Sequence, residues 1–172
     1  MKWTRELSPR DKKKLKRNVS DTHLYELTEL VVNLVYDDLL KELKLEKYRA
    51  EIIFYILMDT KDIPGYATFY TKEENDSGKF EIDIYPRVIL EDLILLNEND
   101  IIREIIIIIA HEMRHLYQYD KMGKKKYNKE DKKSNVNDDN YVNTRLEKDA
   151  EKFSLSFYNK YKHIADDIKS RV

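Results

Sequence analysis

The sequence contains no cysteine. This absence excludes disulfide bonds and every metal site that uses a thiolate ligand. A metal ion could be held only by histidine, aspartate or glutamate, and such ligands suit zinc in an open, catalytic type of site. A search for metal ligands therefore begins with the four histidines of the chain.

Long apolar segments are absent as well. No apolar run approaches the roughly 20 residues that span a bilayer, and the first residues lack the apolar region of a signal peptide. We therefore expect a soluble, cytoplasmic protein with no membrane partner.

An excess of positive or negative charge is also missing. The chain has 33 acidic and 32 basic residues, for a net charge of −1. A molecule with this balance carries no strong field toward nucleic acid or anionic lipid, so a nucleic-acid partner is not expected. A basic arm at residues 1–19 is the exception. It could contact a partner, but we favour a solvated arm because Asp11 interrupts its charge.

The length of 172 residues predicts one domain, here residues 20–172, with enough chain for a core. Leucines and valines at helical spacing predict a helix that ends near Leu43 and packs behind a sheet. Apolar and alternating patterns predict strands at 51–58, 66–71 and 80–85. We expect an antiparallel meander because the connections are short. Gly65 is expected to supply a positive φ in the turn before the second strand.

The most informative stretch follows a run of five isoleucines, 105–109, and reads His111-Glu112-Met113-Arg114-His115. On a helix, two histidines four residues apart project from one face and can bind one zinc ion. Glu112 then lies beside the metal, where it can take a proton from a zinc-bound water. The isoleucines would anchor this helix, predicted at about 101–119, in the core. The alternative is a pair of solvated histidines on an amphipathic helix, with Glu112 as an ordinary surface acid.

A catalytic zinc ion needs a third protein ligand, and the last predicted helix, from 143 or 144 to 168, offers candidates. Glu147 is in its first turn, and Glu151 is four residues later on the same face. One carboxylate could bind the metal while the other accepts a ring N–H of His111 or His115. Alternatively, Glu147 forms a capping box with Thr144. His163 is a further option, but it is far along the helix.

Residues 120–140 have almost no apolar content, so the sequence predicts a long, mobile, charged loop between these two helices.

The order of elements resembles the gluzincin-type zinc metallopeptidases, the minimal scaffold of minigluzincins and of the soluble core of HtpX-like peptidases. It is also similar to the repressor-cleaving ImmA/IrrE-type proteases. The resemblance rests on the His-Glu-x-x-His motif and on Glu147-Lys148-Asp149-Ala150-Glu151, and it covers roughly residues 20–170. It implies an α+β, zincin-like fold with a backing helix, a three-stranded, mainly antiparallel sheet, an active-site helix and a C-terminal helix that carries the glutamate.

The resemblance also implies roles for individual residues. Zn²⁺ would be bound by His111, His115 and Glu147, and Glu151 would take the place of the family's aspartate, which orients a zinc-bound histidine. An extended protein or peptide substrate would add to the edge strand at Ala67, Thr68 and Phe69. The residue that stabilises the oxyanion is not identified, and Tyr117, Tyr141 and His163 are the candidates.

We expect a zinc-dependent metalloendopeptidase with Glu112 as the general base. The alternative is a regulatory, non-catalytic zinc-binding module of the same fold that acts through a protein partner. A structural helical protein without metal is the third possibility.

Overall fold

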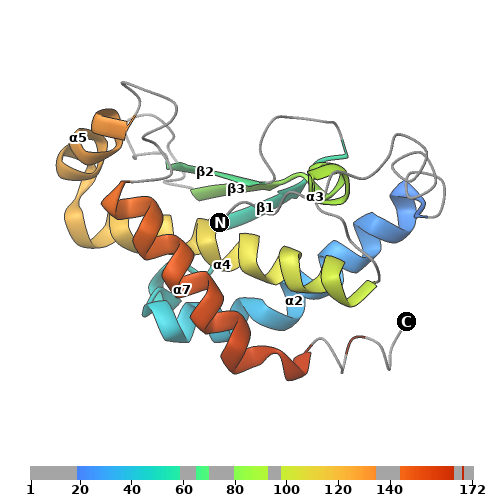
Figure 1. The fold of residues 1–172 in the computed structure, drawn as a ribbon. Helices are drawn as coiled ribbons and strands as arrows, with labels where there is room; N and C mark the ends of the chain where they lie inside the picture. Colours follow the sequence, from blue (N-terminus) through green and yellow to red (C-terminus); the bar gives the residue numbers. More distant parts are fainter. Residues whose placement is uncertain are drawn as a thin grey trace.

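The computed structural model describes residues 19–58, 65–69, 80–92, 98–134, 144–164 and 168. These form a mainly helical α+β fold in which five α-helices accompany a small sheet (Figure 1). The basic arm predicted at 1–19 lies outside the described residues except for Val19.

Helix α4 (Glu98–Met122) is the centre of the fold (Figure 1). It contacts strands β2 and β3 on one side and helices α2 and α7 on others. Its isoleucine run is buried, with Ile105, Ile106 and Ile109 at 0% exposure. Burial of apolar area, at about 25 cal/mol per Å², outweighs the weak preference of isoleucine for helices. The helix predicted at about 101–119 is confirmed and is longer than expected at both ends.

Helix α2 (Asp21–Leu43) forms where the apolar periodicity predicts it. The hydroxyl of Ser20 caps its first turn by accepting the His23 N–H at 3.1 Å. Lys44 ends the helix in the left-handed conformation with φ 55°. The buried face of α2 packs mainly against α4 and also contacts β1.

The sheet contains β1 (Ile52–Ile56), β2 (Gly65–Phe69) and β3 (Phe80–Ile84) in the order β1-β3-β2. The expected antiparallel meander is therefore wrong. β3 lies between the other two strands, parallel to β1 and antiparallel to β2. The short connection over 57–64 still allows this order, because a chain of that length can cross the roughly 10 Å occupied by two strand spacings.

The loop predicted at 120–140 is helical over much of its length. α4 continues to Met122, Gly123 adopts φ 75°, and α5 follows at Lys124–Ser134. Tyr127 is buried and its ring centroid lies 5.6 Å from that of Tyr119, so one aromatic contact holds a polar helix against α4. Residues 135–140 of the predicted loop lie outside the described residues.

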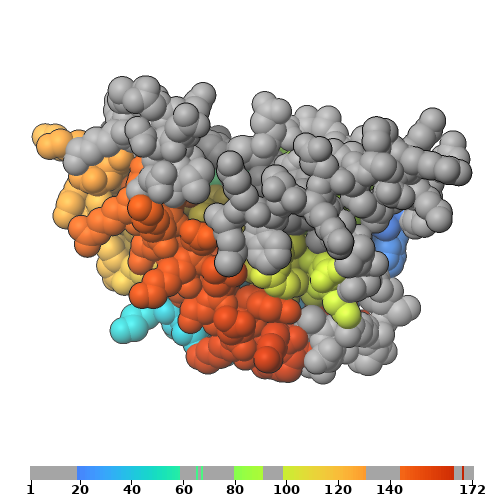
Figure 2. Space-filling view, viewed as in Figure 1, coloured from blue at the N-terminus to red at the C-terminus, as the bar shows by residue number. Residues whose placement is uncertain are grey.

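Helix α7 (Arg145–Tyr161) follows Thr144 and ends before the predicted limit at 168. It runs across α4 in the opposite direction and buries Leu146, Ala150 and Phe157 (Figure 1). In the space-filling view α7 occupies the front of the molecule, and the N-terminal end of α4 shows beside it (Figure 2). Within the described ranges, no helix has the length and apolar content needed to cross a membrane.

Asp120 ties the end of α4 to the short helix η1 (Glu46–Tyr48). Its side chain is 11% exposed, and its Oδ1 accepts the Tyr48 hydroxyl at 2.6 Å and the Lys47 ammonium at 2.8 Å. Burial acts to raise the pKa of Asp120, but these two hydrogen bonds outweigh it and the pKa lies below its ordinary value. A carboxyl whose pKa is lowered by folding stabilises the fold above its unfolded pKa and loses that effect as pH falls.

We predict that Asp120→Asn lowers the free energy of unfolding by about 1–2 kcal/mol at pH 7. The difference from the wild type should shrink as pH falls below about 4, because Asp120 of the unfolded chain then takes up a proton more readily than Asp120 of the folded protein. Urea unfolding at a series of pH values measures both. Asp37→Asn, which removes the exposed partner of Arg49, is the control and should change stability by less than about 0.5 kcal/mol. A wild-type advantage that persists undiminished at pH 3 would contradict the assignment.

Candidate metal centre

His111 and His115 lie one helical turn apart on the face of α4 that meets α7. Their Nε2 atoms are 3.0 Å apart, and His115 is only 6% exposed. The buried isoleucines of the preceding turns fix the rotation of α4, so both imidazoles are held toward the same point. This placement excludes the alternative of two solvated histidines.

Glu147 reaches the same point from α7. Its Oε2 lies 3.1 Å from Nε2 of His111, and its Oε1 lies 3.2 Å from Nε2 of His115. The hydroxyl of Thr144 caps α7 by accepting the backbone N–H of Glu147 at 3.2 Å. Thr144 therefore caps the helix, but the carboxylate of Glu147, which would return to the N-cap in a capping box, faces the histidines instead.

The three side chains form a cluster that could hold a metal ion. Ligand atoms about 2.0–2.1 Å from a tetrahedral zinc ion stand about 3.3 Å from one another. The three donor separations, 3.0, 3.1 and 3.2 Å, are close to that spacing. Two imidazole nitrogens and one carboxylate are also a common ligand set for catalytic zinc. The residues present therefore fit the metal that the motif implies.

The electrostatics of the cluster favour a positive charge between its members. Burial opposes ionisation of Glu147, but hydrogen bonds from His111 and His115 outweigh burial and hold the pKa of Glu147 far below its usual range. For His115, burial acts to lower the pKa, while the hydrogen bond to Glu147 and the charge of Glu112 raise it to a net value above the ordinary one. A site that attracts a proton in this way also attracts a metal cation.

Glu112 faces strand β2 beside the cluster. Burial raises the pKa of its carboxyl, against the charges of His111 and His115 and a hydrogen bond from the backbone of Ala67. A raised pKa strengthens the conjugate carboxylate as a base. The contact with Ala67 places Glu112 between the histidines and the edge strand.

Gly65 allows this close approach of β2 to α4. A Cβ at this position would lie 2.6 Å from Cγ2 of Ile108 and 3.3 Å from Cγ of Glu112. The expected positive φ at Gly65 is wrong: it is the first residue of β2, and Gly123 is the glycine with positive φ among the described residues. Gly65 is required for the space it leaves and not for its backbone conformation. The sequence signal, a Pro-Gly pair before a strand, indicates a turn equally well.

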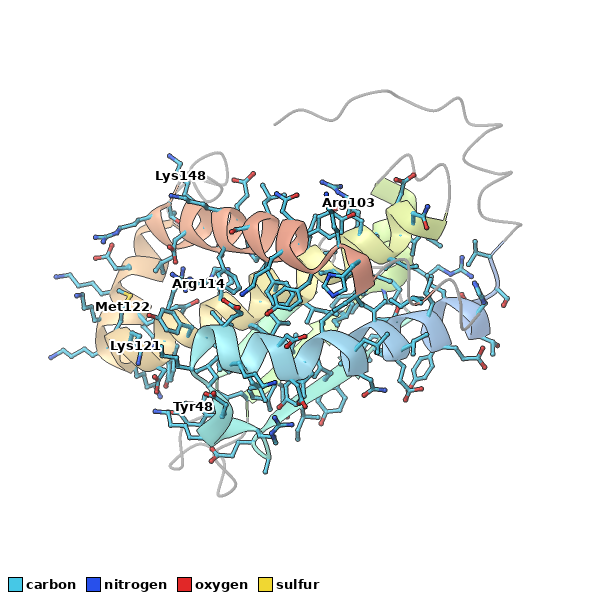
Figure 3. The ribbon with its side chains drawn as sticks, turned by 90° about the horizontal axis from the view of Figure 1, so that it is seen from below. Tyr48, Arg103, Arg114, Lys121, Met122 and Lys148 are labelled. Carbon is cyan, nitrogen blue, oxygen red and sulfur yellow. The ribbon has the colours of Figure 1, made fainter. Side chains whose placement is uncertain are left out.

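Gln118 is a site residue that the sequence analysis missed. Its Oε1 lies 3.0 Å from Nδ1 of His115, and its Nε2 donates to the carbonyl of Leu146 and to Oδ2 of Asp149, both at 2.9 Å. Asp149 also accepts from Arg114 at 2.8 and 3.2 Å, and this guanidinium holds the pKa of Asp149 below its ordinary value. Figure 3 labels Arg114 where α7 lies against α4. The available signal was the spacing of Gln118, three residues after His115 on one helix.

Other predicted site residues are not brought to the cluster. Glu151 is exposed, and the partner of Nδ1 of His115 is Gln118 instead. His163 is exposed beyond the far end of α7, with its ring near Tyr161. Tyr117 contacts Arg114, whose guanidinium carbon lies 4.4 Å from the centroid of the Tyr117 ring. Tyr141 and the side chains of Thr68 and Phe69 lie outside the described residues.

No protein-family model, curated protein or solved structure matches this chain.

Gly65→Ala should separate β2 from α4. Ile108 is β-branched and nearly fixed in rotamer on a helix, so its Cγ2 has little freedom to move away from a new Cβ. We expect the free energy of unfolding to fall by about 1–3 kcal/mol and the amide of Ala67, which contacts Glu112, to exchange faster with solvent. Hydrogen exchange followed by NMR measures the second effect.

Gly123→Ala is the matched control for Gly65→Ala. Nothing lies within 4 Å of a Cβ at Gly123, but its φ of 75° strains any other residue. It should lose about 1–2 kcal/mol of stability and leave the exchange of the Ala67 amide unchanged. Equal protection of Ala67 in both variants would show that Gly65 does not set the approach of β2 to Glu112.

Proposed function

We propose that the protein is a zinc-dependent metalloendopeptidase of the gluzincin type, with a zincin-like fold. The observation that carries the proposal is the convergence of His111, His115 and Glu147 at tetrahedral spacing directly beside Glu112. A metal site alone needs only the first three residues. The fourth, a half-buried carboxylate with a raised pKa, supplies the base that hydrolysis requires.

Each residue has a separate task. His111, His115 and Glu147 hold the zinc ion, which when bound polarises a carbonyl and makes water a stronger nucleophile. The Glu112 carboxylate takes the proton from the attacking water. It then delivers this proton to the nitrogen of the leaving amine as the peptide bond breaks. Glu112 is next to His111 in sequence and its carboxylate contacts the backbone of Ala67 on β2, so two elements of the fold fix its position.

The position of strand β2 supports the proposal that the substrate is a peptide. It is an edge strand, since β3 is its partner on one side in the order β1-β3-β2. Ala67 already contacts the base through its backbone. An extended peptide that pairs with this edge as a further strand would place a scissile bond near Glu112. The sequence-based expectation of binding at Ala67, Thr68 and Phe69 remains part of this proposal. So do the protein or peptide substrate and the cytoplasmic location of the protein.

A regulatory zinc-binding module of the same fold is the competing function. It requires the three ligands but has no need of a base. The close approach of Gly65 and Ala67 to Glu112 therefore favours a hydrolase over a module that only binds a partner.

Glu112→Gln tests the catalytic role. The amide keeps the shape of the side chain but cannot accept the proton, so peptide hydrolysis should fall by roughly 10²–10⁴-fold while zinc content stays at the wild-type level. Cleavage of a fluorogenic peptide library together with atomic emission measures both. Glu26→Gln, an exposed position on α2, is the matched control and should retain full activity. Undiminished hydrolysis by the Glu112 variant would reject Glu112 as the base.

His115→Ala tests the metal site independently of activity. Loss of a buried ligand should strip most of the zinc after dialysis against metal-free buffer, since two ligands remain from a set of three. His163→Ala removes an exposed histidine that lies just beyond the end of α7, and it should retain the wild-type zinc content. Equal zinc retention by the two variants would show that His115 is not a ligand.

A further inference from the structure

Gln118 is the single glutamine of the chain, and it is 5% exposed. It lies between α4 and α7, the two helices of the candidate metal centre. On α4 it follows His115 by three residues, and it contacts the first turn of α7. A buried amide is costly unless both of its ends are hydrogen-bonded. At Gln118 both ends are.

The partners of Gln118 fix which way its amide points. The carbonyl of Leu146 can only accept a hydrogen bond, and so can the ionised carboxylate of Asp149. The NH₂ group must therefore face α7, and Oε1 must face His115. Asp149 is itself held in place by two hydrogen bonds from Arg114.

This orientation determines the proton on His115. Oε1 of an amide can only accept, so Nδ1 of His115 must carry a hydrogen for the 3.0 Å contact to be a hydrogen bond. A metal ion would replace the proton that Nε2 otherwise donates to Glu147, so in the neutral ring with Nδ1 protonated Nε2 offers a lone pair. That is the atom that faces His111 and Glu147.

We infer that Gln118 is a positioning residue that holds His115 in the tautomer required to bind the metal, with Asp149 and Arg114 fixing the amide. The inference rests on the proposed metal site. Leu146 and Asp149 flank Glu147 in sequence, so the amide that sets the tautomer of one ligand also fixes the helical turn that supplies another.

The competing explanation is that Gln118 only cross-links α4 and α7. Such a role depends on its two donated hydrogen bonds and not on the acceptor that faces His115. The two explanations differ in what a carboxylate at this position should do. It keeps an acceptor for His115 but replaces the donors with a second acceptor, which opposes Asp149.

The experiment compares zinc affinity, by competition with a chromophoric chelator, in four proteins. Gln118→Met keeps the length of the side chain but loses the strong acceptor for His115 together with the two hydrogen bonds donated to α7, and it should bind zinc 10–100-fold more weakly than the wild type. Gln118→Glu combined with Asp149→Asn restores an acceptor for His115 and a donor toward position 118. It should bind zinc within about threefold of Asp149→Asn alone.

Two controls make the result specific. Ser154→Ala removes a buried hydroxyl of α7, which donates to the carbonyl of Glu151. It should keep wild-type zinc affinity even if it lowers stability. In the zinc-saturated wild type, long-range ¹H–¹⁵N correlation spectra of labelled histidine should show the His115 proton on Nδ1.

Two outcomes overturn the inference while leaving the metal site intact. In the first, Gln118→Met binds zinc with wild-type affinity. In the second, the double variant binds zinc no better than Gln118→Met. If the wild type binds no zinc at all, the proposed function fails together with its premise. If zinc is bound and the His115 proton is found on Nε2, the tautomer assignment is wrong.

Discussion

The packing of α7 against α4 is the contact on which the candidate metal centre depends. α4 supplies two imidazoles. The carboxylate that completes the set is that of Glu147 on α7, which is 32 residues after His115 in the sequence (147 − 115). One face of α4 is held by its buried isoleucines, so the opposite face is presented to α7 at a fixed rotation. A small rotation of either helix would separate Glu147 from the histidines, since its two oxygens contact both rings.

The same interface contains several hydrogen-bonded polar side chains, among them Arg114, Gln118 and Asp149. Among the described residues, no buried side-chain nitrogen or oxygen lacks a hydrogen bond. Arg114 is placed between the rings of Tyr117 and Phe153, with its guanidinium 4.4 and 5.1 Å from their centroids, and it pairs with Asp149. A positive charge is thus paired with an acid beside Glu147, at a position where it does not enter the cluster. The field at the ligand atoms remains favourable to a cation.

Several features of this arrangement followed from local sequence patterns. The periodicity after Ser20 predicted α2, and the isoleucine run with its two histidines predicted α4, because each pattern is long and has one interpretation. The position of β3 between β1 and β2 was not predictable, because strand order depends on pairing between distant segments. α5 was missed because a helix whose main buried contact is Tyr127 has no apolar stripe. Gln118 has no motif of its own, and its role follows only from the atoms at both ends of its amide.

The sheet explains how Glu112 is held beside the candidate metal cluster. β2 approaches α4 so closely that only glycine fits at position 65, and the residue it approaches is Glu112, which no metal needs as a ligand. Close backbone approach has a structural cost, because glycine loses more conformational freedom on folding than any other residue. The contact orients the Glu112 carboxylate between the two histidines and β2, the edge strand of the described sheet. Under the proposed function a base would act here on a peptide bound along that strand, so the proposal depends on the smallest residue of β2.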